Sequence, residues 1–495
     1  MNDRRDARRA LVMSTLAFGV CFACWVLNGV LITYLVDAQV YAFSTAQVGW
    51  LLGVPVLTGS LTRLPAGLLA DKYGGRLIFT WLLLVTAVPM YLASLADGYG
   101  EFLLAGLGFG LSGASFAVGV TYVAAWTPPQ RMGTALGVFG AGNAGAAFTS
   151  IVGPMLLVRF TSGGQYVDGW RMLPQLYAAG LVVTAVAFYA LTRTRLPDHI
   201  AGQSLAQRLA PLRNPRVWRF GLYYVAVFGG FVALSQWMIG YYVNVYDMSV
   251  STAGLLAACF SLPSAVTRVL GGWLSDRLGA RSVMYGVFGC MAIGCALLMV
   301  PKMDIDTPGE GIMATRDGSV LAVSAEQILV DDKVYPLQRA NANRDAAVES
   351  DVVVFPTVTR RQDPVVQVGD RVVKRQLLAR GVTHVSFQAS VYIFTAILFV
   401  VGCAMGIGMA AVYKHIPHYF PQSVGVTGGI VGVIGGLGGF LCPILFGYLF
   451  RLTGVWTSCW VFLAGLTLVC LVWMHVVVGR LLRERAPHLA QQFER

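Results

Sequence analysis

The sequence predicts an all-α polytopic membrane protein with twelve transmembrane helices in two pseudo-symmetric six-helix halves, and a small β-rich insert between helices 9 and 10. Three observations predict this fold class. Of the 495 residues, 56% are hydrophobic and only 12% are charged, whereas soluble domains carry about a quarter charged residues. Apolar stretches long enough to cross a bilayer of about 30 Å recur along the chain. One segment repeats another, and a single polar stretch interrupts the pattern.

The apolar stretches predict the order and bounds of the spans. We expect them at residues 11–36, 47–70, 77–95, 100–125, 134–160, 171–192, 218–245, 251–274, 282–300, 388–412, 424–450 and 456–478. The expected divisions are an N-terminal half (1–192), a cytoplasmic linker (193–217), a C-terminal half in two parts (218–300 and 388–478), the insert (301–387) and a cytoplasmic tail (479–495).

Basic residues predict the orientation of the spans. With the N-terminus inside, the inner segments hold twenty Lys and Arg residues, and the outer loops, without the insert, hold three. Because cytoplasmic loops retain positive charge, we expect a multi-pass protein of the cell (inner or plasma) membrane with both termini in the cytoplasm. The net charge of +12 lies in short loops and forms no continuous basic face, so nucleic acid is not an expected partner. The nine cysteines fall within or beside apolar spans, and the one CxxC pair, Cys21 and Cys24, lies in an apolar helix without His or carboxylate partners, so we expect no metal and no cofactor.

An internal repeat relates the two halves of the chain. Residues 62–76 match 267–281 at an offset of 205, with Thr, Arg, Gly, Asp, Gly and Arg coinciding. A weaker match aligns Gly133, Gly137 and Gly140 with Gly425, Gly429 and Gly432 at an offset of 292. The difference of 87 residues between these offsets is the length of the polar stretch 301–387. Two six-helix halves and one insertion therefore account for the chain.

The end of each repeat copy resembles the loop motif of the major facilitator superfamily. The matching residues are Gly67, Asp71 and Arg76 in the first copy and Gly272, Asp276 and Arg281 in the second. Glycine there permits close helix packing, and the Asp and basic side chains can pair across the interface of the halves to stabilise one conformation of a rocking transporter. The alternative, topogenic charge alone, does not explain two copies at a constant offset.

The insert reads as a small all-β unit on the outer side. It holds 23 of the chain's 60 charged residues, and its short β-branched runs are punctuated by Asp-Gly, Gly-Asp and Pro. Residues 368–381 resemble the hairpin of barrel-sandwich hybrid (lipoyl/biotinyl-like) domains, with Arg375 in place of the usual Gly. The Met-Lys-Met turn that carries the cofactor in such carriers is not in the sequence. We therefore interpret the insert as a structural β-module.

Arg63 and Arg268 are the charged residues expected at the hydrocarbon centre of the spans. A buried Arg there costs several kcal/mol and cannot lose its proton, and the spans offer no Asp or Glu to neutralise it. The repeat places both at pseudo-symmetric positions, where a two-half transporter has its central cavity. We therefore expect their two guanidinium forks to hold an anion. The alternative is that each Arg extends to the cytoplasmic interface.

Glycine-rich runs lie near this pair in spans 5 and 11. The candidate residues are Gly140, Gly142, Gly432, Gly435 and Gly436. Close approach there would let helices slide and narrow the cavity to a small ligand, although small-residue runs also serve packing alone. Asn143 is the one amide in its run, and it is suited either to donate to an anion or to form an interhelical hydrogen bond.

The residues of spans 4, 5 and 11 resemble the two signatures of the nitrate/nitrite porter family. The first signature matches Gly113 to Gly119, Tyr122 to Pro128 and Gly137 to Gly145, and the second matches the glycine run of span 11. The resemblance covers all twelve spans and leaves out 301–387. It implies membrane transport of nitrate and/or nitrite by alternating access, with the anion held by Arg63 and Arg268, lined by Phe116, Tyr224 and Phe228, and with Asn143 in the motif. Taken alone, Phe116 and Tyr224 would be assigned to packing or lipid contact.

The sequence leaves the coupling open. Inward movement of a monoanion against a negative potential costs about 2.3 kcal/mol per 100 mV, so another ion must move with or against it. The span centres lack Asp, Glu and His, and two uncompensated arginines would resist rocking, which favours nitrate/nitrite antiport. The cluster of Lys414, His415 and His418 and the GxGNAG form of the span 5 signature favour proton symport. On balance, we expect nitrate/proton symport.

Other classes of protein are also compatible with the sequence. An organic-phosphate or other small-anion exchanger would also need paired arginines, but with a roomier and more polar cavity. A nitrate receptor would use the outer β-module for signalling. We do not expect an enzyme, because the apolar core holds no P-loop, no nucleophile with its base and no haem-ligand pair. We expect a monomer whose partners are nitrate, nitrite, protons and the lipid bilayer.

Overall fold

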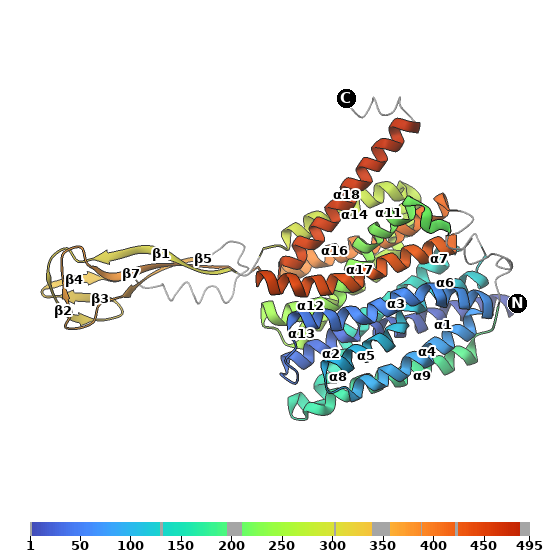
Figure 1. Cartoon of the computed structure of the whole chain (residues 1–495), viewed down its shortest axis with the longest axis horizontal. Helices are drawn as coiled ribbons and strands as arrows, with labels where there is room; N and C mark the ends of the chain where they lie inside the picture. The colour runs from blue at the N-terminus through green and yellow to red at the C-terminus, as the bar shows by residue number, and fades with distance from the viewer. Residues whose placement is uncertain are drawn as a thin grey trace. The chain divides into compact units, whose positions relative to one another are not determined.

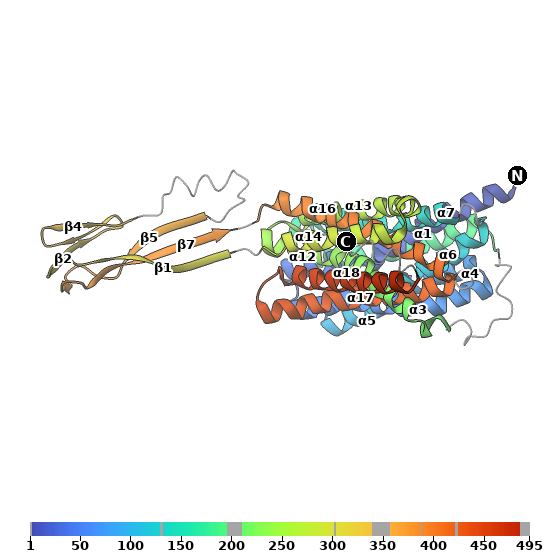
Figure 2. The same cartoon turned by 90° about the horizontal axis from the view of Figure 1, so that it is seen from above.

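The computed structural model describes residues 2–128, 132–195, 210–300, 303–338, 357–387, 389–420 and 424–485. The chain forms two compact units, one of Met1–Met299 with Thr395–Arg495 and the other of Val300–Phe394 (Figure 1 and Figure 2). Within the described residues, twelve helical spans are long and apolar enough to cross a membrane. The predicted number of spans is therefore confirmed.

The helices follow the predicted order in both halves. Those of the N-terminal half are α1 (Asn2–Trp25), α2 (Leu27–Asp37), α3 (Thr45–Tyr73), α4 (Gly75–Leu92), α5 (Tyr99–Phe109), α6 (Ser115–Trp126), α7 (Met132–Gly140), α8 (Gly145–Phe160) and α9 (Met172–Leu191). Those of the C-terminal half are α11 (Pro215–Tyr224), α12 (Gly230–Tyr246), α13 (Val250–Leu278), α14 (Ala280–Leu297), α16 (Val391–Tyr419), α17 (Val424–Thr453) and α18 (Ser458–Arg485). The helix α18 extends beyond the predicted start of the tail at 479. Arg131, most of the linker (196–209) and the chain end (486–495) lie outside the described residues.

The repeated helices α3 and α13 share their length and their ends. Each has 29 residues. The side chains of Ser44 and Ser249 cap their first turns by accepting a backbone N–H three residues on, at 3.3 Å and 3.2 Å. Both helices stop at a glycine, Gly74 with φ of 89° and Gly279 with φ of 82°. Because other residues adopt positive φ only at a cost, glycine allows the sharp change of direction into the next helix.

In three spans, a short turn of 3₁₀ or π-helical geometry interrupts the α-helix near its middle. Tight 3₁₀ turns occupy Gly110–Ala114 between α5 and α6 and Ala141–Ala144 between α7 and α8. A wider π-helical turn occupies Val225–Gly229 between α11 and α12. Such turns redirect backbone carbonyls and side chains, and they occur often at functional sites.

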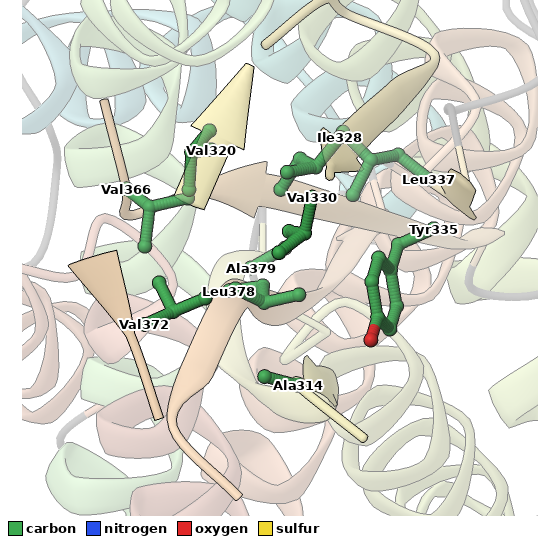
Figure 3. Close-up of a cluster of buried hydrophobic side chains, with 10 residues drawn as sticks. All are labelled: Ala314, Val320, Ile328, Val330, Tyr335, Leu337, Val366, Val372, Leu378 and Ala379. Carbon is green, nitrogen blue, oxygen red and sulfur yellow. The ribbon is translucent and has the colours of Figure 1, made fainter. Parts of the chain in front are cut away.

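The insert is an antiparallel β-unit, as predicted. Its strands are β1 (Met303–Met313), β2 (Gly318–Val323), β3 (Gln327–Val330), β4 (Lys333–Pro336), β5 (Thr357–Pro364), β6 (Arg371–Val372) and β7 (Leu377–Phe387), in sheets of order β1-β7-β5 and β4-β3-β2-β6. Its small core includes Val320, Ile328 and Leu378 (Figure 3). Met303 pairs with Phe387, so the two ends of the insert lie side by side. Arg375 has φ of 72°, a conformation that explains the usual Gly at this position.

Candidate functional site

The two repeat-related arginines meet at one aromatic ring inside the bundle. Arg63 of α3 is 3% exposed and Arg268 of α13 is 8% exposed. Their guanidinium carbons lie 5.8 Å and 5.3 Å from the ring centroid of Phe116 on α6. Among the described residues, neither arginine forms an ion pair with a carboxylate. Both side chains therefore lie in the interior, as expected, and the alternative of arginines that extend to the interface does not hold.

Arg63 is held by backbone carbonyls from both halves. Its Nε donates to the carbonyl oxygen of Gly113 at 3.2 Å, and its Nη1 donates to that of Gly432 at 2.7 Å. Gly113 lies in the 3₁₀ turn before α6, and Gly432 lies on α17 of the opposite half. The rings of Trp25 and Phe228 lie 5.3 Å and 5.0 Å from the guanidinium carbon. Arg63 therefore links the two halves within an aromatic enclosure.

Arg268 retains a buried donor without a partner. No described residue accepts a hydrogen bond from its Nη1, although this atom is shielded from solvent. A buried charged donor left unpaired is costly, so this atom is suited to a ligand or a water molecule as its acceptor. A Cβ at Gly140 would lie 3.3 Å from Arg268 Nε, so this glycine makes room for the guanidinium.

Tyr224 and Phe228, the other two predicted aromatic residues, form one wall of the site together with Tyr413, which was not predicted. Tyr224 stacks on Phe228 with centroids 4.9 Å apart, and the ring of Tyr413 stands edge-on to Tyr224 at 5.0 Å. Tyr413 also lies 6.3 Å from Phe116 and donates to the Gly428 carbonyl at 2.9 Å. Tyr413 and Trp25 were missed because an aromatic residue in an apolar span has no pattern that separates a site residue from a packing residue.

The glycines of α17 allow site residues to approach this helix closely. A Cβ at Gly435 would collide with the ring of Tyr224, and one at Gly432 would lie 3.0 Å from the Tyr413 hydroxyl. At Gly436 it would collide with the side chain of Ser60 and lie 3.5 Å from Arg63 Nη1. In the N-terminal half, Gly142 packs against the Phe18 ring in the same way. These glycines therefore shape the enclosure as well as the helix packing.

Asn143 lies in the 3₁₀ turn after α7 and forms no hydrogen bond to Arg63 or Arg268 within the described structure. It is 1% exposed, and its Nδ2 lies 3.9 Å from Met409 Sδ on α16. Its Oδ1 has no hydrogen-bond partner within the described part of the chain. An unsatisfied buried amide is suited to a polar ligand or a water molecule.

The charged residues of the loop motif make their described contacts within their own halves. Arg76 donates through Nε and Nη2 to the Tyr189 carbonyl, at 3.1 Å and 2.6 Å. Asp276 pairs with Lys414, and Arg281 donates to the Tyr419 hydroxyl at 3.0 Å. Asp71 lies half-buried in the last turn of α3. For Arg76, Asp276 and Arg281, the expected pairing across the halves is therefore not what the structure shows.

The motif glycines do not pack closely in this conformation, contrary to the prediction. Among the described residues, a Cβ at Gly272 would meet nothing within 4 Å, and one at Gly67 would meet only Ala117, at 3.7 Å. The adjacent Gly271 packs directly on Ile407 instead. Gly67 and Gly272 lie toward the end of the bundle where α1 begins, which we call the tail end. Packing there does not require their lack of a side chain.

The two halves instead meet tightly at the opposite end of the bundle, where α14 ends and α16 begins, which we call the insert end. Gly49 of α3 packs on the Pro443 carbonyl of α17, and Gly254 of α13 packs on the Ser150 carbonyl of α8. The helices α3 and α17 run side by side (Figure 1). The structure is therefore a conformation closed at the insert end, which explains why the motif glycines at the tail end have room around them.

Two six-helix halves with a buried arginine pair and interrupted helices define a membrane transporter of the major facilitator type. The family model described as Major Facilitator Superfamily matches residues 13–315. A bacterial homologue of the human lysosomal transporter Spinster, in an inward-facing and occupied conformation, has the same fold with a TM-score of 0.60, 14% identity, and coverage of 94% of this chain and 95% of its own.

Sequence relatives narrow the class. This chain is 38% identical to the "Probable nitrate/nitrite antiporter NarK1" of Thermus thermophilus, over 99% of this chain and 96% of that protein. It is 25% identical to the "Nitrite extrusion protein" of Bacillus subtilis, over 96% of each. The chain belongs to the nitrate/nitrite porter family of the major facilitator superfamily, as the sequence motifs predicted, and its relatives are transporters rather than enzymes.

Proposed function

We propose that this protein exchanges nitrate and nitrite across the cell membrane, with both termini in the cytoplasm and one chain as the working unit. The unpartnered Nη1 of Arg268, facing the same ring as Arg63, is the observation that carries the proposal. A bound anion would supply the acceptor that the described residues do not. The names of the relatives, which specify nitrate and nitrite, support this choice of anion.

The chemistry of the enclosure suits a small planar monoanion. Guanidinium groups present parallel N–H donors that match the oxygens of such an anion. The rings of Phe116 and Phe228 and the glycines of α17 leave little polar lining for a larger, more hydrated anion such as an organic phosphate. Removing nitrate from water costs less than removing a phosphate, so a mostly apolar site with two cations suffices.

Exchange is favoured over the proton symport that the sequence suggested. Lys414, a titratable candidate, pairs with Asp276, and His415 stacks on Phe220 at 5.3 Å, in a separate cluster with Tyr419. The side chain of His418 lies outside the described residues. Without an anion, the two arginines would carry uncompensated charge through the conformational change, so the loaded carrier should cross more readily. Symport stays the second candidate because of the GxGNAG motif in span 5.

Transport by the purified full-length chain in proteoliposomes tests both modes. We expect uptake of labelled nitrate when the vesicles contain nitrite or nitrate, and little uptake into vesicles without either anion. Uptake into vesicles that contain neither anion, driven only by an inward proton gradient, would instead establish symport. No nitrate flux under any loading would refute the proposed substrate.

A further inference from the structure

A recess at the tail end of the C-terminal half is lined by cationic and aromatic side chains that the transport site does not use. It lies where α11, α14, α16 and α18 meet, and its lining includes Arg219, Phe220, Arg281, Tyr419 and Met474. These helices begin or end at the tail end, so the recess lies at the level of the membrane interface. The recess is therefore separate from the buried arginine pair.

Three guanidinium groups concentrate positive charge at this recess. Arg216 lies 5.2 Å from the ring of Tyr419, Arg219 lies 5.4 Å from that of Phe220, and Arg281 donates to the Tyr419 hydroxyl. Among the described residues, none of the three pairs with a carboxylate, and the nearby Asp276 pairs with Lys414. A cluster of half-buried arginines without carboxylates is suited to an oxyanion with several acceptor oxygens.

Comparison of the two repeat copies shows that Arg281 is freer than its counterpart. Arg76, at the equivalent place in the N-terminal half, directs two nitrogens at the carbonyl of Tyr189 near the end of α9. The helix α18 corresponds to α9 but continues to Arg485, so it offers Arg281 no terminal carbonyl. Most of the donors of Arg281 therefore stay available to a ligand.

We propose that this recess binds the headgroup phosphate of an anionic phospholipid. Basic pockets between transmembrane helices are suited to such headgroups on the cytoplasmic side, which is the side that the loop charges predict here. Arg219 and Arg281 would donate to the phosphate oxygens, and Arg216 would add to the field. A zwitterionic lipid would bring its own cation into the cluster, so the site should prefer a net negative headgroup.

Native mass spectrometry of the full-length protein, titrated with dioleoylphosphatidylglycerol or dioleoylphosphatidylcholine, tests this site. We expect tighter binding of the anionic lipid, and about tenfold weaker binding by the double variant Arg219→Gln/Arg281→Gln. Arg277→Gln is the matched control, because Arg277 has the same charge at the tail end of α13 and contacts Trp273 outside the recess. Equal binding by wild type and double variant, or an equal loss in the control, would overturn the proposal.

Two further measurements are needed. One distinguishes a bound lipid from a soluble phosphate, and the other distinguishes loss of the binding site from unfolding of the variant. Inorganic phosphate and glycerol phosphate at millimolar concentration should not displace the lipid, and displacement by either would show that the ligand is a soluble phosphate. If the double variant unfolds early, Arg219→Gln alone is measured, since Arg219 lies over the ring of Phe220 and forms no ion pair with a carboxylate within the described structure. Unchanged binding by this folded single variant would likewise refute the lipid site.

Discussion

The two buried arginines should respond differently to replacement by lysine, which keeps the charge and removes the planar fork. Arg63 donates to two carbonyls, at 3.2 Å and 2.7 Å, and a lysine retains at most one of these bonds. A hydrogen bond from a charged donor contributes about 1.5–3 kcal/mol, and a buried carbonyl left unpaired adds to the loss. We therefore expect Arg63→Lys to lower the free energy of unfolding by about 2–4 kcal/mol and to impair transport.

Arg268 makes no hydrogen bond to the protein through Nη1, so Arg268→Lys has little to lose in the folded state. The substitution should instead weaken the binding of the anion. Loss of one charge-assisted hydrogen bond to nitrate weakens binding by roughly tenfold to a hundredfold. We therefore expect a KM for nitrate higher by that factor and a thermal unfolding temperature close to that of the wild type.

Nitrate/nitrite exchange in proteoliposomes gives the KM, and intrinsic fluorescence of the same detergent preparation during heating gives the unfolding temperature. Arg277→Lys on α13 is the matched control and should change neither quantity, because Arg277 is exposed at the tail end. Equal destabilisation by Arg63→Lys and Arg268→Lys would contradict the assignment of different roles. A wild-type KM for Arg268→Lys would contradict its role in binding the anion.

Three further outcomes follow from the structure. Gly435→Ala, whose added methyl collides with the Tyr224 ring, should reduce nitrate exchange by about tenfold or more, whereas Gly429→Ala, with open space around it, should retain wild-type exchange. The left-handed backbone of Arg375 costs about 1 kcal/mol, and Arg375→Gly should remove this cost and stabilise the insert. The amides of the insert should then exchange hydrogen more slowly in the full-length protein, and unchanged or faster exchange would argue against strain there. Replacement of residues 303–387 by a short Gly/Ser linker should preserve exchange, because the ends of the insert are paired neighbours; complete loss in a folded variant would favour the receptor hypothesis.

The sequence predicted the fold because the bilayer imposes strong constraints on length and charge. A helix must be apolar over about twenty residues to span the membrane, so the twelve spans are readable without knowledge of their packing. The repeat of α3 and α13 is readable for a similar reason. Ser44 and Ser249 cap the two helices, and Gly74 and Gly279 end them with positive φ.

The interruptions within the spans could not be predicted in the same way. The segments 110–114, 141–144 and 225–229 consist of small and apolar residues apart from Asn143, and no pattern in them distinguishes a tight or a wide turn from an α-helical one. Their tight and wide turns arise where neighbouring helices press closely, as Gly110 does against the Pro55 carbonyl. Tertiary contacts decide such turns, so a local pattern carries no signal for them. For Arg76, Asp276 and Arg281, the pairing predicted across the halves differs from the structure for a related reason, because such pairing depends on which end of the bundle is closed.

The two arginines are symmetric in sequence and asymmetric in their contacts, and this difference suggests how binding and rocking are connected. Arg63 Nη1 reaches across to Gly432 on α17, whereas Arg268 Nη1 has no acceptor in the described structure. An anion between them would accept from Arg268 first and would then compete with the Gly432 carbonyl for Arg63. Binding of the anion would therefore weaken the hydrogen bond between Arg63 and Gly432 that links the halves, and release of the anion would restore it. A carrier built in this way changes conformation most readily while an anion is bound, which is the property that exchange requires.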